Sequence, residues 1–259
     1  MSIKHFIRQS LWRVGLDVTR YNPVSSEASQ LAKQLSAQQV DVVFDVGANT
    51  GQFAAMLRAA EFRGRIVSFE PSTSAHSILL QQVRSNDNWK VAPRMALGDR
   101  DGTTTLNLAA NSFSSSVLTM LPSHVSAAPE SRYIGTETAD LRKLDSIGAE
   151  FATETERIFL KLDVQGFESS VLQGAKEFLR QVVGIQIELS LVPLYEGETL
   201  FHPMLHKLEE EGFEMWSIVP GLVDPKTKRL LQVDGIFFRN DLQAKLGLVP
   251  ECDITSRIG

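Results

Sequence analysis

Two glycines and two acidic residues mark the part of the sequence whose residue types and spacing best suit ligand binding. Gly47 and Gly51 follow an apolar run at residues 41–46 and precede a stretch with helical spacing. In an open α/β sheet, such a strand–turn–helix unit places ligands at the carboxyl end of the strand, where the helix offers unpaired backbone N–H groups. Asp45 closes this strand, and Glu70 closes the next one, nineteen residues beyond Gly51, where such folds place the acid that binds ribose hydroxyls. The unit therefore predicts a site for a ligand that contains a nucleoside.

The residues around the two glycines separate the candidate ligands. A loop for a nucleoside triphosphate needs a Lys and a Ser or Thr after its last glycine, whereas Gln52 and Phe53 follow Gly51. A dinucleotide fingerprint needs a further glycine where this chain has Ala48 and Asn49. S-Adenosylmethionine requires only a close backbone approach at the glycines, an acid near its cationic end and an acid at its ribose, all of which are present. The alternative is a turn whose glycines serve only the packing of the strand against the helix.

A second group of polar residues closes a later strand, at residues 157–164. Because side chains alternate along a strand, Lys161, Asp163 and Gln165 point to one face. A buried lysine and aspartate are costly unless they pair or bind a ligand. We therefore weigh a structural ion pair against a ligand site, and the position at the carboxyl end of the sheet favours the site. Glu188, near the end of the following strand, is either a second active-site carboxylate or a capping partner for the next segment.

The histidines give weaker signals. His202 and His206 are four residues apart on a predicted helix, a spacing compatible with a metal site, but no HExxH pattern and no obvious third ligand accompany them. We expect a solvated helix face and no metal. His124 lies in a long loop, where a substrate could meet it.

The pattern of elements predicts a doubly wound α/β domain. Short apolar runs alternate with amphipathic stretches, as in βα units with a mostly parallel sheet. We expect strands at residues 41–46, 65–69, 90–96, 157–164 and 183–189, helices starting near residues 51, 74, 168 and 174, and a further helix at 203–211. An extra strand or hairpin is expected at residues 99–108, a loop at 111–138, and two antiparallel strands at 213–219 and 233–238. The domain spans residues 41–240, between a helical extension at 1–40, with a helix at 26–38, and a tail at 241–259.

Composition excludes several classes of protein. The 259 residues carry 26 Lys+Arg and 31 Asp+Glu, a net charge of −5, so the chain is not the basic domain that nucleic acid requires, and we expect no nucleic-acid partner. No apolar run reaches the roughly 18 residues of a membrane-spanning helix. The single cysteine, Cys252, cannot form an intramolecular disulfide, and we expect a cytoplasmic location.

The first twenty residues predict an amphipathic helix. Its apolar side consists of Ile3, Phe6, Ile7, Leu11 and Val14, and its basic side of Lys4, Arg8 and Arg13. Such a helix packs on the protein or in a homodimer, or it rests peripherally on the inner face of an anionic membrane.

With these groups of residues in view, the chain resembles the FkbM family of S-adenosylmethionine-dependent methyltransferases. The motifs that carry the resemblance span about residues 41–240 and are FDVGANTG at 44–51, SFEP at 68–71, ALGD at 96–99, LKLDVQGFE at 160–168, LQGA at 172–175, IELS at 187–190 and DGIFF at 234–238. The resemblance implies a class I, Rossmann-like methyltransferase fold with a seven-stranded, mostly parallel sheet and an antiparallel C-terminal strand. It also implies the cofactor S-adenosyl-L-methionine and an acceptor hydroxyl on a sugar, a glycolipid or a polyketide-type small molecule.

The resemblance assigns roles by position. It implies a methionine side of the cofactor site formed by Asp45, Gly47, Ala48, Asn49, Thr50, Gly51 and Phe53. Glu70 would hold the ribose, Pro71, Ala96 and Leu97 would flank the adenine, and Asp163 would stand between the methyl group and the acceptor. The acceptor side would include Ser115, Ser116, Lys161, Tyr195 and His202.

Transfer of a methyl group to an alcohol calls for a base within hydrogen-bond reach of the hydroxyl, since an alcohol is a poor nucleophile at neutral pH. Asp163 is the first candidate, followed by Glu188 and His124, and Lys161 would keep Asp163 ionised. Two alternatives remain open at this point. One is an NAD-dependent oxidoreductase or epimerase, which would share Glu70 and the glycine turn, and the other is a non-catalytic docking module.

Overall fold

The computed structural model describes residues 26–83 and 88–239. The predicted amphipathic helix in the first twenty residues, Cys252 and the tail at 241–259 lie outside the described residues. In the part that the structure describes, no helix is long and apolar enough to cross a membrane.

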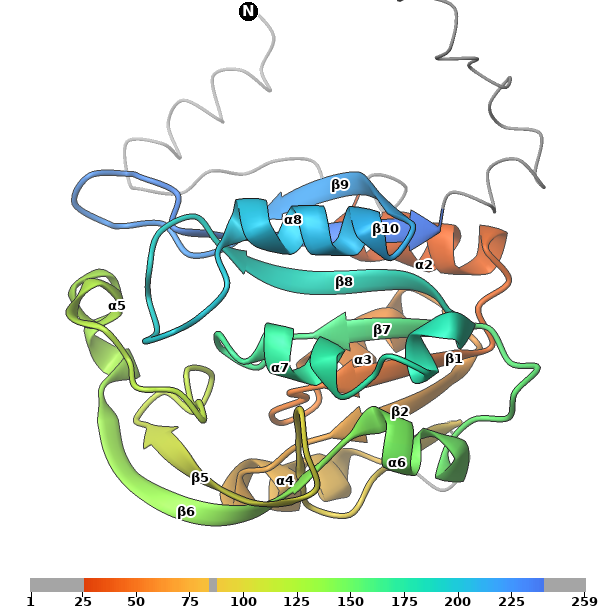
Figure 1. Cartoon of the computed structure of the whole chain (residues 1–259), viewed down its shortest axis with the longest axis horizontal. Coiled ribbons are helices and arrows are strands. Elements are labelled where there is room, and N and C mark those ends of the chain that lie inside the picture. The colour runs from red at the N-terminus through yellow and green to blue at the C-terminus, as the bar shows by residue number, and fades with distance from the viewer. Residues whose placement is uncertain (1–25, 84–87, 240–259) are drawn as a thin grey trace, which may run out of the picture.

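A seven-stranded sheet forms the centre of the molecule (Figure 1). Its strands are β1 (Val42–Val46), β2 (Arg65–Phe69), β3 (Trp89–Val91), β7 (Ile158–Leu162), β8 (Val182–Ser190), β9 (Phe213–Pro220) and β10 (Gln232–Arg239). Their order is β3-β2-β1-β7-β8-β10-β9. Only β10 runs against its neighbours, since it is antiparallel to both β8 and β9. This confirms the predicted mostly parallel sheet with an antiparallel C-terminal strand, and it shows that β9 runs with the parallel strands.

Helices cover both faces of the sheet, as the doubly wound prediction requires. On one face α6 (Leu144–Ile147), α7 (Glu168–Gln173) and α8 (Phe201–Glu210) pack on the side chains of Phe44, Leu160 and Ile185. On the other face α2 (Glu27–Ala37), α3 (Gln52–Ala59) and α4 (Thr73–Gln82) pack on those of Val43 and Phe159. Two short 3₁₀ helices, Gly148–Glu150 and Phe178–Gln181, complete the connections. Because these strands are buried on both sides and are mostly apolar, the few polar residues within them are candidates for a functional role.

The helix α2 is part of the domain core. Leu31, Ala32 and Leu35 are buried against α3 and the sheet, and Ser26 caps the helix by accepting a hydrogen bond from the Ser29 backbone N–H. A boundary at residue 40 therefore separates α2 from elements that it packs against. The division of the chain into an extension, a domain and a tail remains a prediction.

A second, three-stranded sheet lies beside the large one and corrects two predictions. It contains β4 (Ala96–Leu97), β5 (Gly102–Ala109) and β6 (Tyr133–Arg142), in the order β4-β6-β5. The strand expected at 90–96 is in fact split between β3 and β4. The loop expected at 111–138 contains α5 (Pro122–Ala127), a 3₁₀ turn (Pro129–Ser131) and the start of β6. The pattern hid β6 because its first residues face solvent on both sides, so apolar and polar residues do not alternate there.

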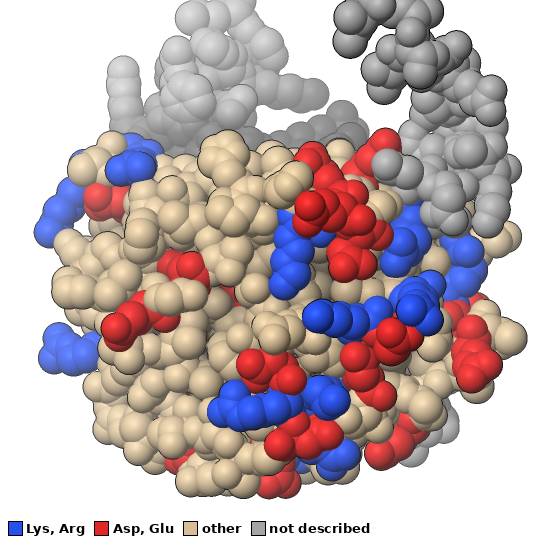
Figure 2. Space-filling model, in the orientation of Figure 1, with Lys and Arg blue, Asp and Glu red and all other residues tan. Residues whose placement is uncertain are grey.

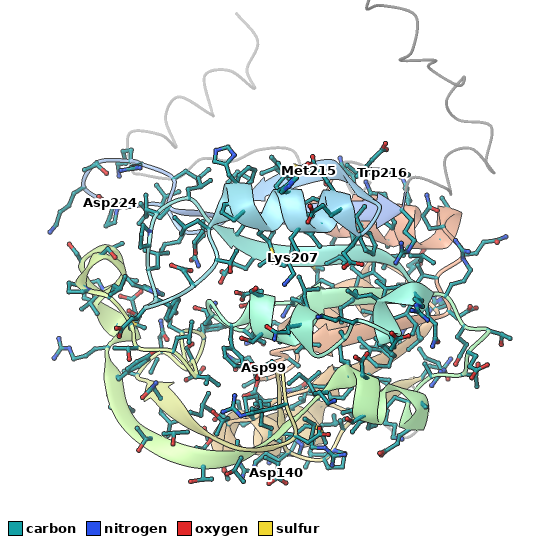
Figure 3. The ribbon with its side chains drawn as sticks, in the orientation of Figure 1. Asp99, Asp140, Lys207, Met215, Trp216 and Asp224 are labelled. Carbon is teal, nitrogen blue, oxygen red and sulfur yellow. The ribbon has the colours of Figure 1, made fainter. Side chains whose placement is uncertain are left out.

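The surface carries charges of both signs. Figure 2 shows acidic and basic side chains next to one another over α6, α7 and α8. Lys207 reaches from α8 towards α7 (Figure 3), where its Nζ lies 3.3 Å from the Ser169 hydroxyl oxygen.

The turn after β1 explains why its first glycine is needed. Gly47 has a φ of +76°, and a Cβ atom there would lie 1.8 Å from the backbone oxygen of Asp163. The two turns are also joined by a hydrogen bond, in which the Asp163 N–H donates to the Val46 backbone oxygen at 3.1 Å. Gly47 therefore lets the turn after β1 pack against the turn after β7.

We expect Gly47→Ala to lower the free energy of unfolding by about 3 kcal/mol or more, because strain at a positive φ adds to a clash with backbone that cannot move aside. Urea denaturation measures the change. Gly135→Ala is the matched control, since a Cβ there meets nothing within 4 Å, and it should stay within about 0.5 kcal/mol of the wild type. Equal stabilities for the two variants would contradict this role of Gly47.

Candidate active site

A row of polar side chains crosses the large sheet near the carboxyl ends of its parallel strands. The register places Asp45 of β1 beside Ser68 of β2 and Lys161 of β7, and Lys161 beside Gln186 of β8. Because strand side chains alternate with a period of two, all four lie on the face that α2 and α3 cover. Val43 and Phe159 form the apolar part of this face closer to the amino ends.

Lys161 is the centre of this row. Its side chain is 7% exposed, and its Nζ lies 3.2 Å from Asp45 Oδ1 and 3.4 Å from Asp163 Oδ2. It donates to the backbone oxygen of Gly47 at 3.1 Å and lies 5.6 Å from the centre of the Phe53 ring. Burial alone would lower the pKa of Lys161, but the carboxylates of Asp163 and Asp45 raise it above its usual value. Lys161 is therefore a fixed cation, as the sequence predicted.

Among the residues that the structure describes, more carboxylates than cations gather around Lys161. Glu188 and Asp234 are direct neighbours across the β8–β10 pair, and the negative charge of Asp163 acts on both. Burial, followed by repulsion from Asp163, raises the pKa of Glu188 well above its usual value and that of Asp234 to about 6. Like charges directly opposite each other destabilise a sheet. A positive ligand would offset this excess of negative charge.

These residues form the floor of a cavity of about 450 Å³, a volume within the range of small-molecule sites. The glycine turn contributes Gly47, Ala48 and Asn49 to its lining, and α3 contributes Gln52, Phe53 and Met56. The polar lining from the strands and from the turn after β7 consists of Lys161, Asp163, Gln165, Gln186, Glu188 and Asp234.

One end of the cavity has the features of a nucleoside site. Glu70 lines it and accepts hydrogen bonds from the backbone N–H groups of Asn49 and Ser72, both at 2.8 Å. Burial raises the pKa of Glu70 to about 7. Apolar side chains beside Glu70 form a slot suited to a flat ring, and they are Phe69, Pro71, Met95, Ala96, Leu97 and Phe167.

The structure separates the predicted site residues into three groups. Those that line the cavity are Gly47, Ala48, Asn49, Phe53, Glu70, Pro71, Ala96, Leu97, Ser115, Ser116, Lys161, Asp163 and Glu188. Four predicted residues are not part of the lining: Asp45, Gly51 and Tyr195, which pack behind it, and Thr50. Asp45 has no exposed surface and reaches the cavity only through Lys161. A Cβ atom on Gly51 would clash with the side chains of Trp89 and Leu79. Gly51 therefore serves the packing of the turn, which is the alternative role that the sequence left open for the glycines.

The third group, His124 and His202, is a correction. His124 is buried in α5, with its ring 5.1 Å from the Tyr195 ring, and it is not part of the cavity lining. His202 is exposed on α8 and lies against a different hollow, beside Leu191 and Phe201. Neither side chain is available to a substrate in the cavity. Within residues 26–83 and 88–239, no group of three or more His, Cys, Asp or Glu side chains is arranged so that it could hold a metal ion.

Segment 111–121, the first part of the loop predicted at 111–138, is tied to the cavity by hydrogen bonds. The Ser116 hydroxyl donates to the backbone oxygen of Gln165 at 2.7 Å, and the Asn49 amide donates to the Ser112 hydroxyl at 3.3 Å. The Ser115 hydroxyl accepts from the Ala109 N–H at 3.0 Å. The two serines therefore fix the cavity wall as well as lining it.

A family model describes the same region of the chain. The model for the methyltransferase FkbM domain matches residues 45–215, from the end of β1 into β9. The chain belongs to the FkbM methyltransferase family. This FkbM protein is an S-adenosylmethionine-dependent methyltransferase, and the oxidoreductase and docking-module alternatives are set aside.

Curated relatives of this FkbM protein are methyltransferases. It is 27% identical over 185 residues to the 2-O-methyltransferase NoeI of Sinorhizobium fredii (strain NBRC 101917 / NGR234), covering 69% of this chain and 74% of that protein. It is 28% identical over 204 residues to methyltransferase sdnD of Sordaria araneosa, covering 67% of this chain and 73% of that protein.

Solved structures that align with this chain are more distant in sequence. TehB from Haemophilus influenzae aligns with a TM-score of 0.46 and 10% identity, covering 90% of this chain and 67% of that one. A putative RNA methyltransferase from Pyrococcus horikoshii aligns with a TM-score of 0.43 and 14% identity, covering 92% and 99%. The sheet order and the family match, not these alignments, define the fold of this FkbM protein.

The cavity of this FkbM methyltransferase fits its cofactor. The apolar slot beside Glu70 suits the adenine, and Glu70 has acceptor capacity for ribose hydroxyls. The excess of carboxylates around Lys161 suits the positive charge of a sulfonium. Several lining residues were not identified from the sequence, above all Asp234, Gln186 and Glu27. Alternation along β8 and β10 could have indicated the first two, whereas nothing in the sequence places α2 over the cavity.

We expect Lys161→Met to lower the free energy of unfolding at pH 7 by about 3 to 5 kcal/mol, because it leaves Asp45 buried without its cation. The double variant Asp45→Asn/Lys161→Met should recover part of this loss in urea denaturation. Lys33→Met, on the exposed side of α2, is the control and should change stability by less than about 0.5 kcal/mol. A double variant less stable than Lys161→Met would contradict the pairing.

Proposed function

We propose that this methyltransferase methylates a hydroxyl oxygen of a polyhydroxylated acceptor, a sugar or the sugar headgroup of a glycolipid. The observation that carries the proposal is the pair of carboxylates, Asp163 and Glu188, that lines the cavity beside Lys161. A hydroxyl needs help to lose its proton, and a carboxylate within hydrogen-bond reach supplies it. The name of one relative, 2-O-methyltransferase, supports an oxygen acceptor.

The two carboxylates differ in their surroundings, and we assign them different roles in the reaction. Asp163 has Lys161 as an ion-pair partner, whereas Glu188 has no ion pair among the described residues. Burial and the charge of Asp163 raise the pKa of Glu188, which makes it a stronger base than an exposed glutamate. Glu188 therefore takes the hydroxyl proton, and Asp163, the first candidate from the sequence, orients the hydroxyl.

S-Adenosylmethionine, when bound, supplies a methyl group on a sulfonium that is already activated for transfer. The chain's own contribution is alignment, which holds the acceptor oxygen in line and excludes water. Glu70 and the apolar slot would fix the nucleoside, and the turn at Gly47 to Asn49 with Phe53 would fix the methionine part.

The part of the cavity beyond Glu188 has a composition suited to a sugar. Its polar side chains are Glu27, Gln186 and Asp234, and its apolar side chains are Leu31, Met56, Val219 and Ile236. Carboxylates and amides can accept and donate hydrogen bonds to sugar hydroxyls, while apolar side chains cover the C–H face of the ring. A polyketide-type acceptor with few hydroxyls would leave these carboxylates unpaired, so we place it second.

From the sequence alone we further propose a cytoplasmic location. The basic amphipathic stretch at residues 3–14 would then contact the inner face of the membrane, where a glycolipid acceptor resides, or a second copy of the chain.

The test of this function is incubation with S-adenosylmethionine and a panel of free sugars and glycolipids. We expect a mass gain of one methyl group, and fragmentation should place it on a hydroxyl oxygen. A methyl group found on nitrogen or carbon, with every hydroxyl acceptor unreacted, would contradict the proposal.

We expect Glu188→Gln to lower kcat by about 100-fold or more, in the range of lost general-base catalysis. Asp163→Asn should lower kcat while leaving the dissociation constant of S-adenosylhomocysteine within about threefold in calorimetry. Glu154→Gln, at an exposed site outside the cavity, is the control. Wild-type turnover in both carboxylate variants would remove the pair from the reaction.

The raised pKa of Glu188 also predicts a pH dependence. The base must be ionised to accept a proton, so kcat/KM should fall as the pH decreases through the pKa of Glu188. Because that pKa lies above the usual value for glutamate, the decrease should begin at a higher pH than for an exposed glutamate. A profile that stays flat down to the usual pKa of a glutamate would argue against Glu188 as the base.

A further inference from the structure

Gln165 occupies a position between the two carboxylates that the proposed reaction does not use. Its side-chain nitrogen Nε2 donates to Asp163 Oδ1 at 2.8 Å and to Glu188 Oε2 at 2.9 Å. One amide therefore contacts both carboxylates with the same NH₂ group. Gln165 is 8% exposed, so these bonds are shielded from water and are worth more than at the surface.

Tyr195 sets the orientation of this amide. Its hydroxyl donates to Gln165 Oε1 at 2.6 Å, so the oxygen end of the amide is held away from the carboxylates and the NH₂ end towards them. Burial raises the pKa of Tyr195 far above its usual value, and the hydroxyl therefore keeps its proton and remains a donor. The Tyr195 ring is itself fixed, with the His124 ring packed edge-on at 5.1 Å.

The backbone of Gln165 has an unfavourable conformation that hydrogen bonds from neighbouring residues stabilise. Its φ is +56°, in the left-handed region that is unfavourable for residues other than glycine. Ser116 donates to its backbone oxygen, and Glu168 Oε1 accepts from the N–H groups of Val164 at 2.9 Å and Gly166 at 3.3 Å. These contacts fix the turn on both sides of Gln165. Such strain is typical of positions where a side chain must point in one direction.

Two carboxylates that bind the same nitrogen atom lie close enough to repel each other, and this repulsion disfavours the form in which both are ionised. Hydrogen bonds to the ionised form favour that form. The Gln165 amide supplies one such bond to each carboxylate, and it also fixes the separation between them.

We propose that Gln165 is a positioning residue that holds Asp163 and Glu188 in one geometry and favours their ionised forms, with Tyr195 setting the direction of its amide. The inference rests on the proposed function for the use made of the two carboxylates, but the contacts themselves do not depend on the acceptor. In this role Gln165 acts through the two carboxylates and does not need to contact the substrate.

The direct test titrates the carboxyl groups without turnover. The infrared band of protonated carboxyl groups is followed against pH in the wild type, Gln165→Met, Gln165→Gly and Tyr195→Phe, each in the full chain. We expect Gln165→Met to move one carboxyl titration to higher pH by about one unit, since the ionised form loses its donor. Tyr195→Phe should give a smaller shift in the same direction, because the amide is then free to turn.

Gln165→Gly separates the amide from the backbone. It removes the amide and also relieves the positive φ, so the same upward shift is expected as in Gln165→Met. Gln81→Met, the same substitution at an exposed site on α4, should titrate as the wild type. A shift in Gln165→Met that is missing in Gln165→Gly would assign the effect to backbone strain and overturn the proposal, as would wild-type titration in both. If neither Gln165 variant folds, Tyr195→Phe decides, and wild-type titration in that variant overturns the proposal.

Kinetics add a readout that distinguishes this inference from the proposed function. In Gln165→Met, kcat should fall and the acid limb of kcat/KM should move to higher pH with the carboxyl titration, while calorimetry should show the S-adenosylhomocysteine dissociation constant within about threefold of the wild type. If no hydroxyl acceptor is ever methylated but the titration shifts as expected, the proposed function fails and the positioning role stands. If methylation occurs and neither the titration nor the pH limb moves, the positioning role fails alone.

Discussion

The ion pair of Lys161 with Asp45 is the interaction on which the site depends. Burying a charge in a sheet is unfavourable unless a partner is fixed opposite it. The register of β1 against β7 supplies that partner, because it places Asp45 directly beside Lys161. Asp45 is fully buried and pairs with Lys161, so it holds the ammonium group of Lys161 in a fixed position in the cavity lining. The contact of Lys161 with the Gly47 oxygen joins the same anchor to the glycine turn.

The cavity then carries an excess of negative charge that the described residues do not neutralise. Asp163, Glu188 and Asp234 surround one lysine that Asp45 already pairs, and the raised pKa values of Glu188 and Asp234 express the cost of this arrangement. Such a cost is typical of functional sites, where a ligand completes the charge balance. A cationic cofactor would complete it here, and the Gln165 amide would fix the separation of Asp163 and Glu188 and favour their ionised forms.

The site residues that could be predicted from the sequence are those at or just after the ends of strands. Asp163, Glu188 and Glu70 were identified because parallel strands bring their carboxyl ends to one edge, whatever the details of packing. Gly47 was assigned to cofactor approach; it lines the cavity, and the sequence did not show that it also contacts the turn after β7. His124 was placed in a loop that proved to include a helix, and no strand anchored the prediction. Asp234 and Glu27 were missed because β10 and α2 come next to β8 and α3 only through the long-range order of the fold.

The excess negative charge can be tested most directly by counting protons on ligand binding. Calorimetry of S-adenosylmethionine at pH 6, repeated in buffers of different ionisation enthalpy, gives the number of protons released, and S-adenosylhomocysteine serves as the neutral comparison. We expect S-adenosylmethionine to release more protons, since its positive charge lowers the pKa values of Glu188 and Asp234. Equal proton release for the two ligands would show that the carboxylates around Lys161 do not respond to the sulfonium and would contradict this explanation of the site.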